Sequence, residues 1–243
     1  MHDHTHSPTQ HTSARRARLG IETSNPRGEQ GRAEVALRLP SEPDLIEPVT
    51  TQGHGTDDLI PAIDRVCKRA AVTPNELEVV AVSIGPGGYT ACRVAVTVAK
   101  LIAEATGAAL VGVPTPVGAA AALPPDVRTA SPVIALAWKR DTAWRYTPDD
   151  DTTADHPSGE LVPLDTLVTE LGAATLVCDT ELRHALVDHH HLPVEYPGHP
   201  IRFSASAVLD AAERIAPCDP ADLLPLYPRE PEAVTKWRAL RGA

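Results

Sequence analysis

The spacing of hydrophobic and polar positions changes repeatedly along the chain and predicts alternating strands and helices. Leu19–Ser24 is a short apolar run typical of a buried strand, and Ala33–Leu39 alternates as a hairpin partner does. Leu45–Val49 predicts a third, shorter strand. The segment Thr56–Ala70 places its apolar residues on one face of a helix, with Thr56 as the expected cap. A continuous β-branched run, Val79–Ile84, then predicts a strand buried on both faces.

This buried strand leads into a glycine turn and a helix that is apolar on most of its sides. Gly85–Gly88 cannot continue either element, Thr90 is placed to cap a helix, and Gly107 is placed to end it. An amphipathic surface helix needs only one apolar stripe. Two interpretations stay open: the helix is buried in its own domain, or a ridge of small residues meets a partner chain at close range. The ridge consists of Ala91, Ala95, Ala99 and Ala103.

The remaining pattern predicts a second, smaller lobe. Ala109–Val113 is a further strand, an alanine-rich helix follows, and a proline-rich break lies at 124–132. Beyond the break come a hairpin and alternating helices and strands. This order predicts a three-layer α/β lobe followed by a second lobe. The expected divisions are a disordered His-rich tail over 1–18, the first lobe over 19–123, the second lobe over 132–229, and a C-terminal tail over 230–243.

Charge and cysteine usage narrow the class of protein. The chain carries a formal net charge of −10, and an acidic chain lacks the basic face that independent nucleic-acid binding needs. No apolar run approaches the ~18 residues of a membrane helix, and no signal-peptide core is visible. These features predict a cytoplasmic protein, and if RNA is involved, another subunit should supply the positive charge. The four cysteines lack a C-x-x-C pair, which argues against a disulfide framework or zinc ribbon: Cys67, Cys92, Cys178 and Cys218.

The glycine turn is the first candidate for a ligand site. Backbone N–H groups at a helix N-terminus bind phosphate, yet this turn matches neither common nucleotide-binding motif. A tight turn that lets strand and helix pack closely explains the glycines equally well. Thr23 and Ser24, which end the first strand, are suited either to face a nucleotide or to cap a turn. The candidate nucleotide-binding residues are Thr23, Ser24, Gly85, Gly87 and Gly88.

Metal and nucleophile signals are weak. His184 and Asp188 lie four apart on a predicted helix, before a run of histidines, a pattern that favours a solvated helix end over a metal site. His54 has no second histidine four residues away, and Lys139-Arg140 is typical of a solvated hairpin tip. The sequence offers no nucleophile with a base and an orienting group. We therefore predict no catalytic residue and no metal ligand.

The glycine turn and its helix also resemble a family signature. Gly85–Ala95 resembles the G-P-G-S-F-T-G-[LV]-R-[IV]-G motif of the bacterial YeaZ (TsaB) family, the dimerization subunit of the tRNA threonylcarbamoyladenosine machinery. Leu19–Ser24 is similar to the family's opening L-A-I-D-T-S, and Ala109–Thr115 to its P-L-V-G-V-S-S strand. Two further matches are His54 with Leu59–Ile63, against H-S-x-x-L-L-P-x-I, and Pro225–Arg229, against P-x-Y-[LI]-R.

The resemblance implies an actin-like, Hsp70-type (ASKHA, ribonuclease H-like) two-lobe α/β fold and a non-catalytic subunit. The partner it implies is the catalytic paralogue TsaD, which holds the metal and modifies the adenosine 3′ of the anticodon. The ATPase subunit TsaE joins the complex, tRNA is met only there, and a homodimer is the alternative in isolation. No cofactor is required, and adenine nucleotide binds at most weakly. The expected interface residues, on the helices Thr56–Ala70 and Ala91–Thr106, are Ile63, Cys67, Ala91, Ala95, Val98, Ala99 and Ile102.

Departures from the family motifs weaken the expectation of nucleotide binding more than the expectation of the fold or of the pairing, and the missing second-lobe aspartate counts against an enzyme. Glu22 stands at the opening aspartate, Gly88 at the signature serine, and Leu136–Lys139 lacks the aspartate of the second-lobe I-D-A-R. The main alternative is an actin-like ATPase or small-molecule kinase that binds nucleotide at the glycine turn, which would need a carboxylate for Mg²⁺. A peptidase would need a paired-histidine metal motif that the helix Thr56–Ala70 lacks.

Overall fold

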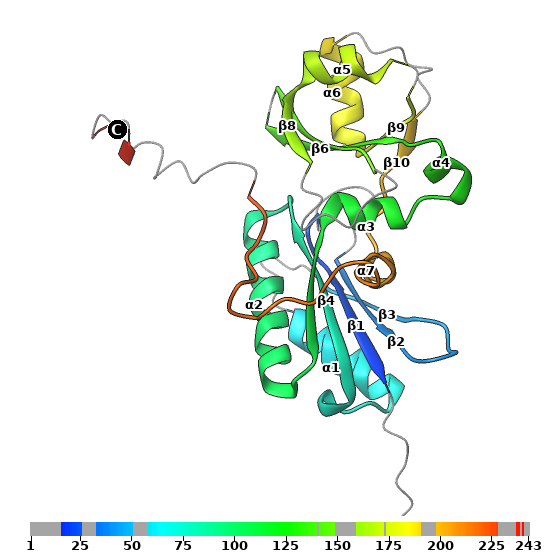
Figure 1. Cartoon of the computed structure of the whole chain (residues 1–243), viewed down its shortest axis with the longest axis vertical. Helices are drawn as coiled ribbons and strands as arrows, with labels where there is room; N and C mark the ends of the chain where they lie inside the picture. The colour runs from blue at the N-terminus through cyan, green and yellow to red at the C-terminus, as the bar shows by residue number, and fades with distance from the viewer. Residues whose placement is uncertain are drawn as a thin grey trace, which may run out of the picture.

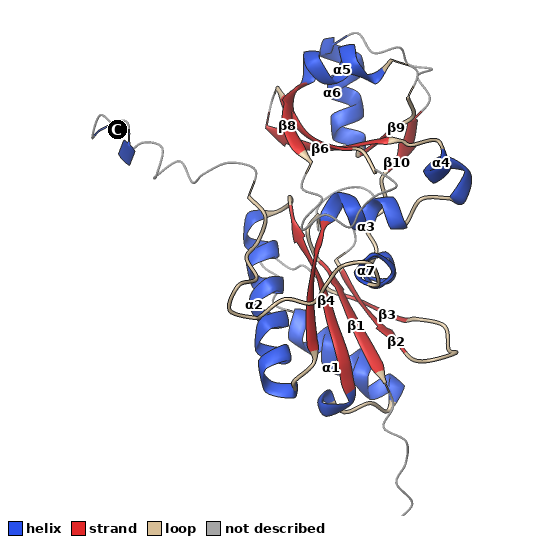
Figure 2. Ribbon diagram, viewed as in Figure 1, coloured by secondary structure: helices blue, strands red, loops and turns tan. Residues whose placement is uncertain are grey.

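The computed structural model describes residues 16–25, 33–50, 58–139, 141–148, 159–172, 174–190, 198–227, 237–238 and 240. These residues form two α/β lobes stacked along the long axis of the molecule (Figure 1), each built on one five-stranded sheet (Figure 2). The predicted two-lobe α/β class is confirmed. Within the described part of the chain, no helix has the length and apolar character needed to cross a bilayer.

The sheet of the first lobe has the strand order β3-β2-β1-β4-β5. β1 lies at its centre, antiparallel to β2 and parallel to β4, which in turn is parallel to β5. The predicted hairpin and the buried central strand are thus confirmed. The strands are β1 (Ala17–Glu22), β2 (Glu34–Arg38), β3 (Leu45–Pro48), β4 (Leu77–Gly85) and β5 (Ala109–Pro114).

Two helices cover one face of this sheet and two cover the other (Figure 1). Large residues such as Leu19, Val80 and Val82 face the first pair, while a row of small residues faces the second pair. That row runs Ala36, Gly20, Ala81 across three paired strands, and a Cβ at Gly20 would lie 2.4 Å from a backbone oxygen of the covering helix. The first pair is α1 (Leu59–Ala70) and α2 (Tyr89–Thr106); the second is α3 (Thr115–Ala121) and α7 (Ala205–Ala212), with the short helix η1 (Pro74–Glu76) preceding β4.

Helix ends differ from the sequence expectations in detail. Gly107 ends α2 with φ 74°, as predicted, and its N–H donates to Ala103. Thr90 does not cap α2, because the helix already begins at Tyr89 with Gly88 before it and no side-chain cap. Thr56, the expected cap of α1, lies outside the described residues.

The second lobe has the strand order β10-β9-β6-β7-β8. Helices α5 and α6 bury their apolar sides with residues of β6, β7, β8 and β9 in one core, while α3 and α4 contribute to a core on the other side of the sheet. The elements are α4 (Pro125–Thr129), β6 (Val133–Lys139), β7 (Thr142–Tyr146), β8 (Glu160–Pro163), α5 (Leu164–Leu171), β9 (Leu176–Cys178), α6 (Thr180–His190) and β10 (Gly198–Pro200).

The predicted second lobe over 132–229 is corrected, because the chain returns to the first lobe after β10. The apolar face of α7 fits the row of small residues on the first sheet, and this fit overrides its position in the sequence. The segment 218–227, which we call the return segment, then follows β5 towards the glycine turn. Cys218 N–H donates to Leu110 O, and Leu226 N–H donates to Ile84 O at 2.8 Å. The predicted N-terminal tail is also shorter by two residues, since β1 begins at Ala17.

Candidate functional site

The glycine turn joins the end of β4 to the start of α2 and lies directly against the end of β1. Gly88 N–H donates to Ser24 O at 2.6 Å. A Cβ at Gly87 would lie only 2.2 Å from the same oxygen, so only glycine allows this approach. Gly85 has φ 106°, and a Cβ there would lie 2.9 Å from Leu226 O of the return segment. The backbone of the chain itself therefore fills the space around the turn.

Beneath the turn lies a group of buried polar side chains at the ends of the three parallel strands. Glu22 is 2 % exposed, and its Oε1 accepts hydrogen bonds from both the N–H and the hydroxyl of Ser24, each at 2.6 Å. Ser83 and Thr115 share a hydrogen bond of 2.9 Å between their hydroxyls. Burial raises the pKa of Glu22, and the hydrogen bonds from Ser24 offset part of that shift. The four side chains form a closed polar cluster.

The five residues expected to bind a nucleotide are thus brought together, but the hydroxyls of Thr23 and Ser24 and the N–H of Gly88 already have partners. The Thr23 hydroxyl donates to Ala91 O at 3.3 Å, and the Ser24 hydroxyl donates to Glu22. Thr23 and Ser24 are 1 % and 0 % exposed, whereas Gly87 and Gly88 are exposed. The arrangement favours the tight-turn interpretation of the glycines. Nucleotide binding itself stays a prediction.

The return segment is fastened to α2 at both ends of its path past the turn. The Tyr227 ring packs on Tyr89 with centroids 5.0 Å apart, and Arg93 lies over the Tyr89 ring and donates to its hydroxyl. Further along α2, the Lys100 ammonium donates to Leu223 O at 3.1 Å. These contacts could not be predicted from the sequence, because a side chain that binds the backbone carbonyl of a distant segment leaves no local sequence pattern.

The residues expected at a partner interface divide into two groups. Ala95 and Ala99 have no exposed surface and lie in the core with the large residues of the sheet, and Ala91 is 8 % exposed. The alanine ridge therefore packs α2 against its own sheet, and its expected contact with a partner chain is corrected. The second group lies farther from the sheet, on the flanks of the two helices. Ile63 and Cys67 of α1 and Val98 of α2 are 7–8 % exposed, and Ile102 of α2 is half-buried.

An exposed apolar surface borders this second group on both helices. Ile60 of α1 and Leu101 of α2 are each 63 % exposed. Val94 and Ala105 lie on the same side of α2 as Leu101, at spacings of seven and four residues, and are half-buried and exposed. Together with Ile63, Cys67, Val98 and Ile102 they form what we call the apolar seam. Its members are Ile60, Ile63, Cys67, Val94, Val98, Leu101, Ile102 and Ala105.

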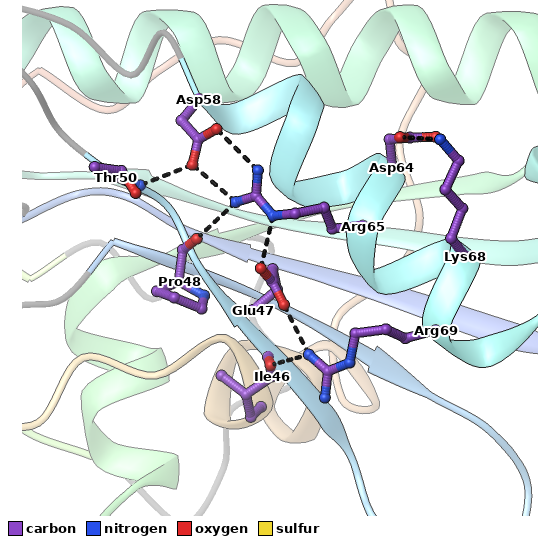
Figure 3. A network of polar contacts seen from close by, with 9 residues as sticks. All are labelled: Ile46, Glu47, Pro48, Thr50, Asp58, Asp64, Arg65, Lys68 and Arg69. Carbon is purple, nitrogen blue, oxygen red and sulfur yellow. Dashed lines mark hydrogen bonds and ion pairs between the residues drawn. The ribbon is translucent and has the colours of Figure 1, made fainter.

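Two sets of contacts show that the α1 and α2 parts of the seam face each other. Arg65 and Arg69, on the opposite flank of α1, reach β3 (Figure 3), so Ile60 and Cys67 lie on the flank towards α2. Lys100, on the opposite flank of α2, reaches the return segment beyond β5. Since α1 lies over β2 and β3 while α2 lies over β4 and β5, the two apolar flanks border the space between the helices.

An ion-pair network fixes α1 to the edge strand β3 (Figure 3). Arg65 bridges Asp58 and Glu47, and Arg69 pairs with the second oxygen of Glu47 at 2.7 Å. The same two arginines donate to Pro48 O and Ile46 O. Hydrogen bonds from Arg65 hold the pKa values of Asp58 and Glu47 below their usual range. The network therefore sets the position of α1, and with it the α1 side of the seam.

The remaining sequence candidates do not form a site among the described residues. In that part of the chain no three His, Cys, Asp or Glu side chains are placed to share a metal ion. The four cysteines are free and buried or half-buried, and burial raises their pKa values, which makes them poor nucleophiles. His54, Arg140 and Arg229 lie outside the described residues, as do the side chains of Lys139 and His189–His191.

Comparison with solved structures gives matches in fold over most of the chain. A crystal structure described as an uncharacterized protein with similarity to peptidase YeaZ from Pseudomonas aeruginosa has a TM-score of 0.67 at 18% identity, and covers 88% of this chain and 100% of its own. The chain has the YeaZ fold. YeaZ from Pseudomonas aeruginosa itself has a TM-score of 0.63 at 16% identity, over 87% of this chain and 99% of that one.

Residues 45–139 also match the family model of TsaD, tRNA N6-adenosine threonylcarbamoyltransferase. That range includes α1, the glycine turn and α2, so it contains the whole apolar seam. No curated protein sequence matches the chain. The expected two-lobe α/β fold of the YeaZ type is confirmed, while the partners, the cofactor requirement and the cytoplasmic location stay predictions.

Proposed function

We propose that this chain is a non-catalytic scaffold subunit of a tRNA threonylcarbamoyladenosine transferase complex. In this proposal it pairs with a metal-dependent catalytic paralogue of the TsaD type, which modifies the adenosine 3′ of the anticodon. The ATPase subunit TsaE joins the assembly, and tRNA contacts this acidic chain only within it. The YeaZ fold over most of the chain and the TsaD family match over 45–139 support the proposal.

The apolar seam is the observation that carries the proposal. Exposed leucine and isoleucine side chains are common singly, but here they extend a row of nearly buried apolar residues shared by two helices. Burying one such side chain at an interface contributes about 1.5–3 kcal/mol. A partner with a similar pair of helices would bury Ile60 and Leu101 together and gain a contact of helix-bundle type.

The glycine turn supports the non-catalytic part of the proposal. Its threonine and serine hydroxyls are bound within the chain, and the nearest carboxylate, Glu22, is buried in the polar cluster. An actin-like ATPase or small-molecule kinase would need such groups free for phosphate and Mg²⁺. Calorimetric titration with ATP and Mg²⁺ tests this alternative. Saturable binding that a Ser24→Ala variant weakens would favour the enzyme over the scaffold.

Size-exclusion chromatography with light scattering tests the pairing directly. The chain is measured alone and mixed with the TsaD-type paralogue from the same organism. We expect a one-to-one complex that Leu101→Arg abolishes, because the substitution places a charge in the contact. Leu224→Arg is the matched control, since Leu224 is also exposed, at 71 %, but lies in the return segment. Equal binding by the two variants, or no complex with the unchanged chain, would contradict the proposal.

A further inference from the structure

The helices α3 and α2 lie on opposite faces of the first sheet and have different neighbours. α3 leads the chain from β5 towards the second lobe (Figure 1). Its residues Ala119 and Ala120 pack in one core with Ile134 of the second lobe, while Ala121 packs beside α7. α2 carries its part of the apolar seam on the other face of the sheet. A change in how the lobes pack therefore reaches α3 first and needs a physical path to reach the seam.

The polar cluster forms such a path around the end of the sheet. Side chains alternate along a strand, so Glu22 and Ser83 continue the row of small residues on the face that α3 covers. Thr115, the first residue of α3, shares its hydrogen bond of 2.9 Å with Ser83. At the other end of the path, Ser24 donates to Glu22 from its N–H and its hydroxyl, and its carbonyl accepts the N–H of Gly88. Since Gly88 immediately precedes α2, the path joins the starts of both helices.

The middle of this path has two hydrogen-bonded arrangements. Ser83 hydrogen-bonds the Glu22 carboxyl as well as Thr115. An ionised carboxylate only accepts, so Ser83 then donates to Glu22 and accepts from Thr115. A protonated Glu22 can instead donate to Ser83, which then donates to Thr115. The other titratable groups that act on Glu22 are Glu34 of β2 and the Cys92 thiol of α2. The cluster thus has the two discrete states that coupling between distant sites requires.

Burial gives this path its energetic weight. The buried Glu, Ser and Thr side chains of the described residues are Thr23 and the four members of the polar cluster, each 2 % exposed or less. A buried polar group that loses its hydrogen bond is costly, because water cannot replace the lost partner. Breaking one bond of the cluster therefore favours rearrangement of the next bond. Thr23 adds a second link to α2, since its hydroxyl donates to Ala91 O.

We propose that the polar cluster, with Glu22 as its central positioning residue, couples the lobe contact made by α3 to the start of α2 and so to the apolar seam. This coupling is a property of the chain alone. Its use rests on the proposed function, because a partner bound on the seam would then alter how the two lobes pack. Linkage makes the effect reciprocal, so a change in lobe packing would alter the affinity of the seam for that partner.

Amide hydrogen exchange in the full chain tests the coupling without a partner. Thr115→Val removes the hydroxyl that meets Ser83 and keeps the shape of the side chain, and the reporter is the Gly88 N–H that Ser24 O accepts. We expect exchange at Gly88 to become about tenfold faster, because the cluster is left with an unpaired buried group. Exchange at Ala36, in the middle of β2, reports opening of the whole sheet and should change much less. Thr115→Ser keeps the hydroxyl and should restore slow exchange.

Thr106→Val is the matched control, since the Thr106 hydroxyl donates to Ile102 O at the far end of α2. It should leave exchange at Gly88 unchanged. Ser83→Ala breaks the same path one bond nearer to Glu22 and should act like Thr115→Val, so the test does not depend on the folding of one variant. Unchanged exchange at Gly88 in both path variants, or equal acceleration at Gly88 and Ala36, would overturn the coupling.

Two substitutions of Glu22 test its central place. Glu22→Gln keeps an acceptor for Ser24 and a polar contact for Ser83, so exchange at Gly88 should stay slow. Glu22→Leu removes both and should accelerate it at least as much as Thr115→Val. Equal exchange in these two Glu22 variants would overturn its role as the positioning residue.

The TsaD-type paralogue tests the use of the coupling. If the paralogue covers the seam, its binding should slow exchange at Ala119 of α3 about fivefold, although α3 lies on the other face of the sheet. Thr115→Val should lose that protection and keep the protection of α2. Protection of α2 without α3 in the unchanged chain would overturn the use of the coupling. If no complex forms, the proposed function fails, while exchange at Gly88 in the chain alone still decides whether the cluster couples α3 to α2.

Discussion

The glycine turn and the apolar seam belong to the same strand-turn-helix unit, yet they differ in what fills them. At the turn, backbone oxygens of Ser24 and Leu226 occupy the space beside Gly87 and Gly85, and the hydroxyls have internal partners. At the seam, Ile60 and Leu101 stand exposed beside nearly buried neighbours. A sequence motif that suggests a ligand site can thus be a packing device, while the adjoining helix holds the surface that another molecule can cover.

The two sides of α2 repeat this contrast within a single helix. Its alanine ridge lies flat on the sheet, where small side chains allow close packing, and its opposite side carries Val94, Leu101 and Ala105 towards the surface. Burial of the helix in its own domain is therefore the correct interpretation of the alanine ridge, while a partner contact stays a prediction and moves to the opposite side of α2. The ridge explains the close packing, and the other side is the one available for a contact.

The largest expected effect on stability comes from placing an arginine on the sheet-facing side of α2, and an arginine on the exposed side is the comparison. Ala99→Arg buries a guanidinium in a core position with no exposed surface, so we expect a loss of at least about 3 kcal/mol in the free energy of unfolding. Leu101→Arg, two residues away and exposed, should change stability by no more than about 0.5 kcal/mol. Urea unfolding followed by circular dichroism measures both. A stably folded Ala99→Arg chain would place the alanine ridge at the surface after all.

The next largest effect concerns how closely the glycine turn packs against the end of β1. Gly87→Ala introduces a Cβ 2.2 Å from Ser24 O, so the turn must move away from β1, at a cost of about 2 kcal/mol or more. Gly107→Ala is the control, because its Cβ meets nothing within 4 Å and only its φ of 74° carries strain, about 1 kcal/mol. Thermal unfolding ranks the two variants. The reverse order would mean that the turn has room for a ligand.

A smaller effect distinguishes the pH dependence that the buried Glu22 gives to stability from the pH dependence that the surface carboxylates Asp58 and Glu47 give. Burial raises the pKa of Glu22, so its contribution to stability is complete below its ordinary value of 4.5 and is lost as pH rises through the raised value. Glu22→Gln keeps an acceptor for Ser24 and cannot ionise. Above that pH it should gain about 1.4 kcal/mol for each unit by which the pKa was raised.

Stability measured between pH 4 and pH 9 checks this assignment. The two unfolding curves should converge at low pH, where Glu22 is protonated, and separate as pH rises. Both proteins should lose stability at the acid end, because Arg65 lowers the pKa values of Asp58 and Glu47 and their contributions disappear when they are protonated. Parallel curves over the whole range would show that Glu22 is not the titrating group.

The smallest effect tests how the α1 side of the seam is held. Arg65→Ala removes two ion pairs and a hydrogen bond to Pro48 O, but Arg65 is 40% exposed, so solvent screening keeps the loss of stability small. Lys68→Ala removes one exposed ion pair with Asp64 and should cost less than Arg65→Ala, since a single pair of this kind contributes about 0.3 kcal/mol. Denaturant midpoints at low and high salt measure the difference. Equal losses would mean that the network adds nothing to the placement of α1.

Much of the fold follows from local patterns in the sequence, and the parts that do not follow depend on distant contacts. The β-branched run of β4, the glycine turn and the αL residue Gly107 each carry a local signal, and each is where it was expected. The return of α7 to the first sheet depends on the fit of its apolar face to Ala36, Gly20 and Ala81, which come from three separate strands. No window of sequence contains that row.

The candidate site was predicted with the same mixture of success and error. The residues around the turn do meet, because strands β1 and β4 are adjacent and parallel. Which side of α2 faces outward could not be predicted, since both sides are apolar and periodicity alone gives no direction. The interface assignment of Ile63, Cys67, Val98 and Ile102 stays a prediction, whereas Ala95 and Ala99 have no exposed surface and pack in the core of the first lobe.

The arginines that reach from α1 to β3 also affect how another chain can attach to this edge of the sheet. In β3, Ile46 and Pro48 point their backbone groups away from β2, since Val49 N–H pairs inward with Ala33 O. Arg69 and Arg65 occupy the two outward carbonyls, and Pro48 has no N–H to offer. This border of the sheet is therefore a poor template for an added strand. Growth into strand-paired aggregates is discouraged there, and association is left to side chains on the helices.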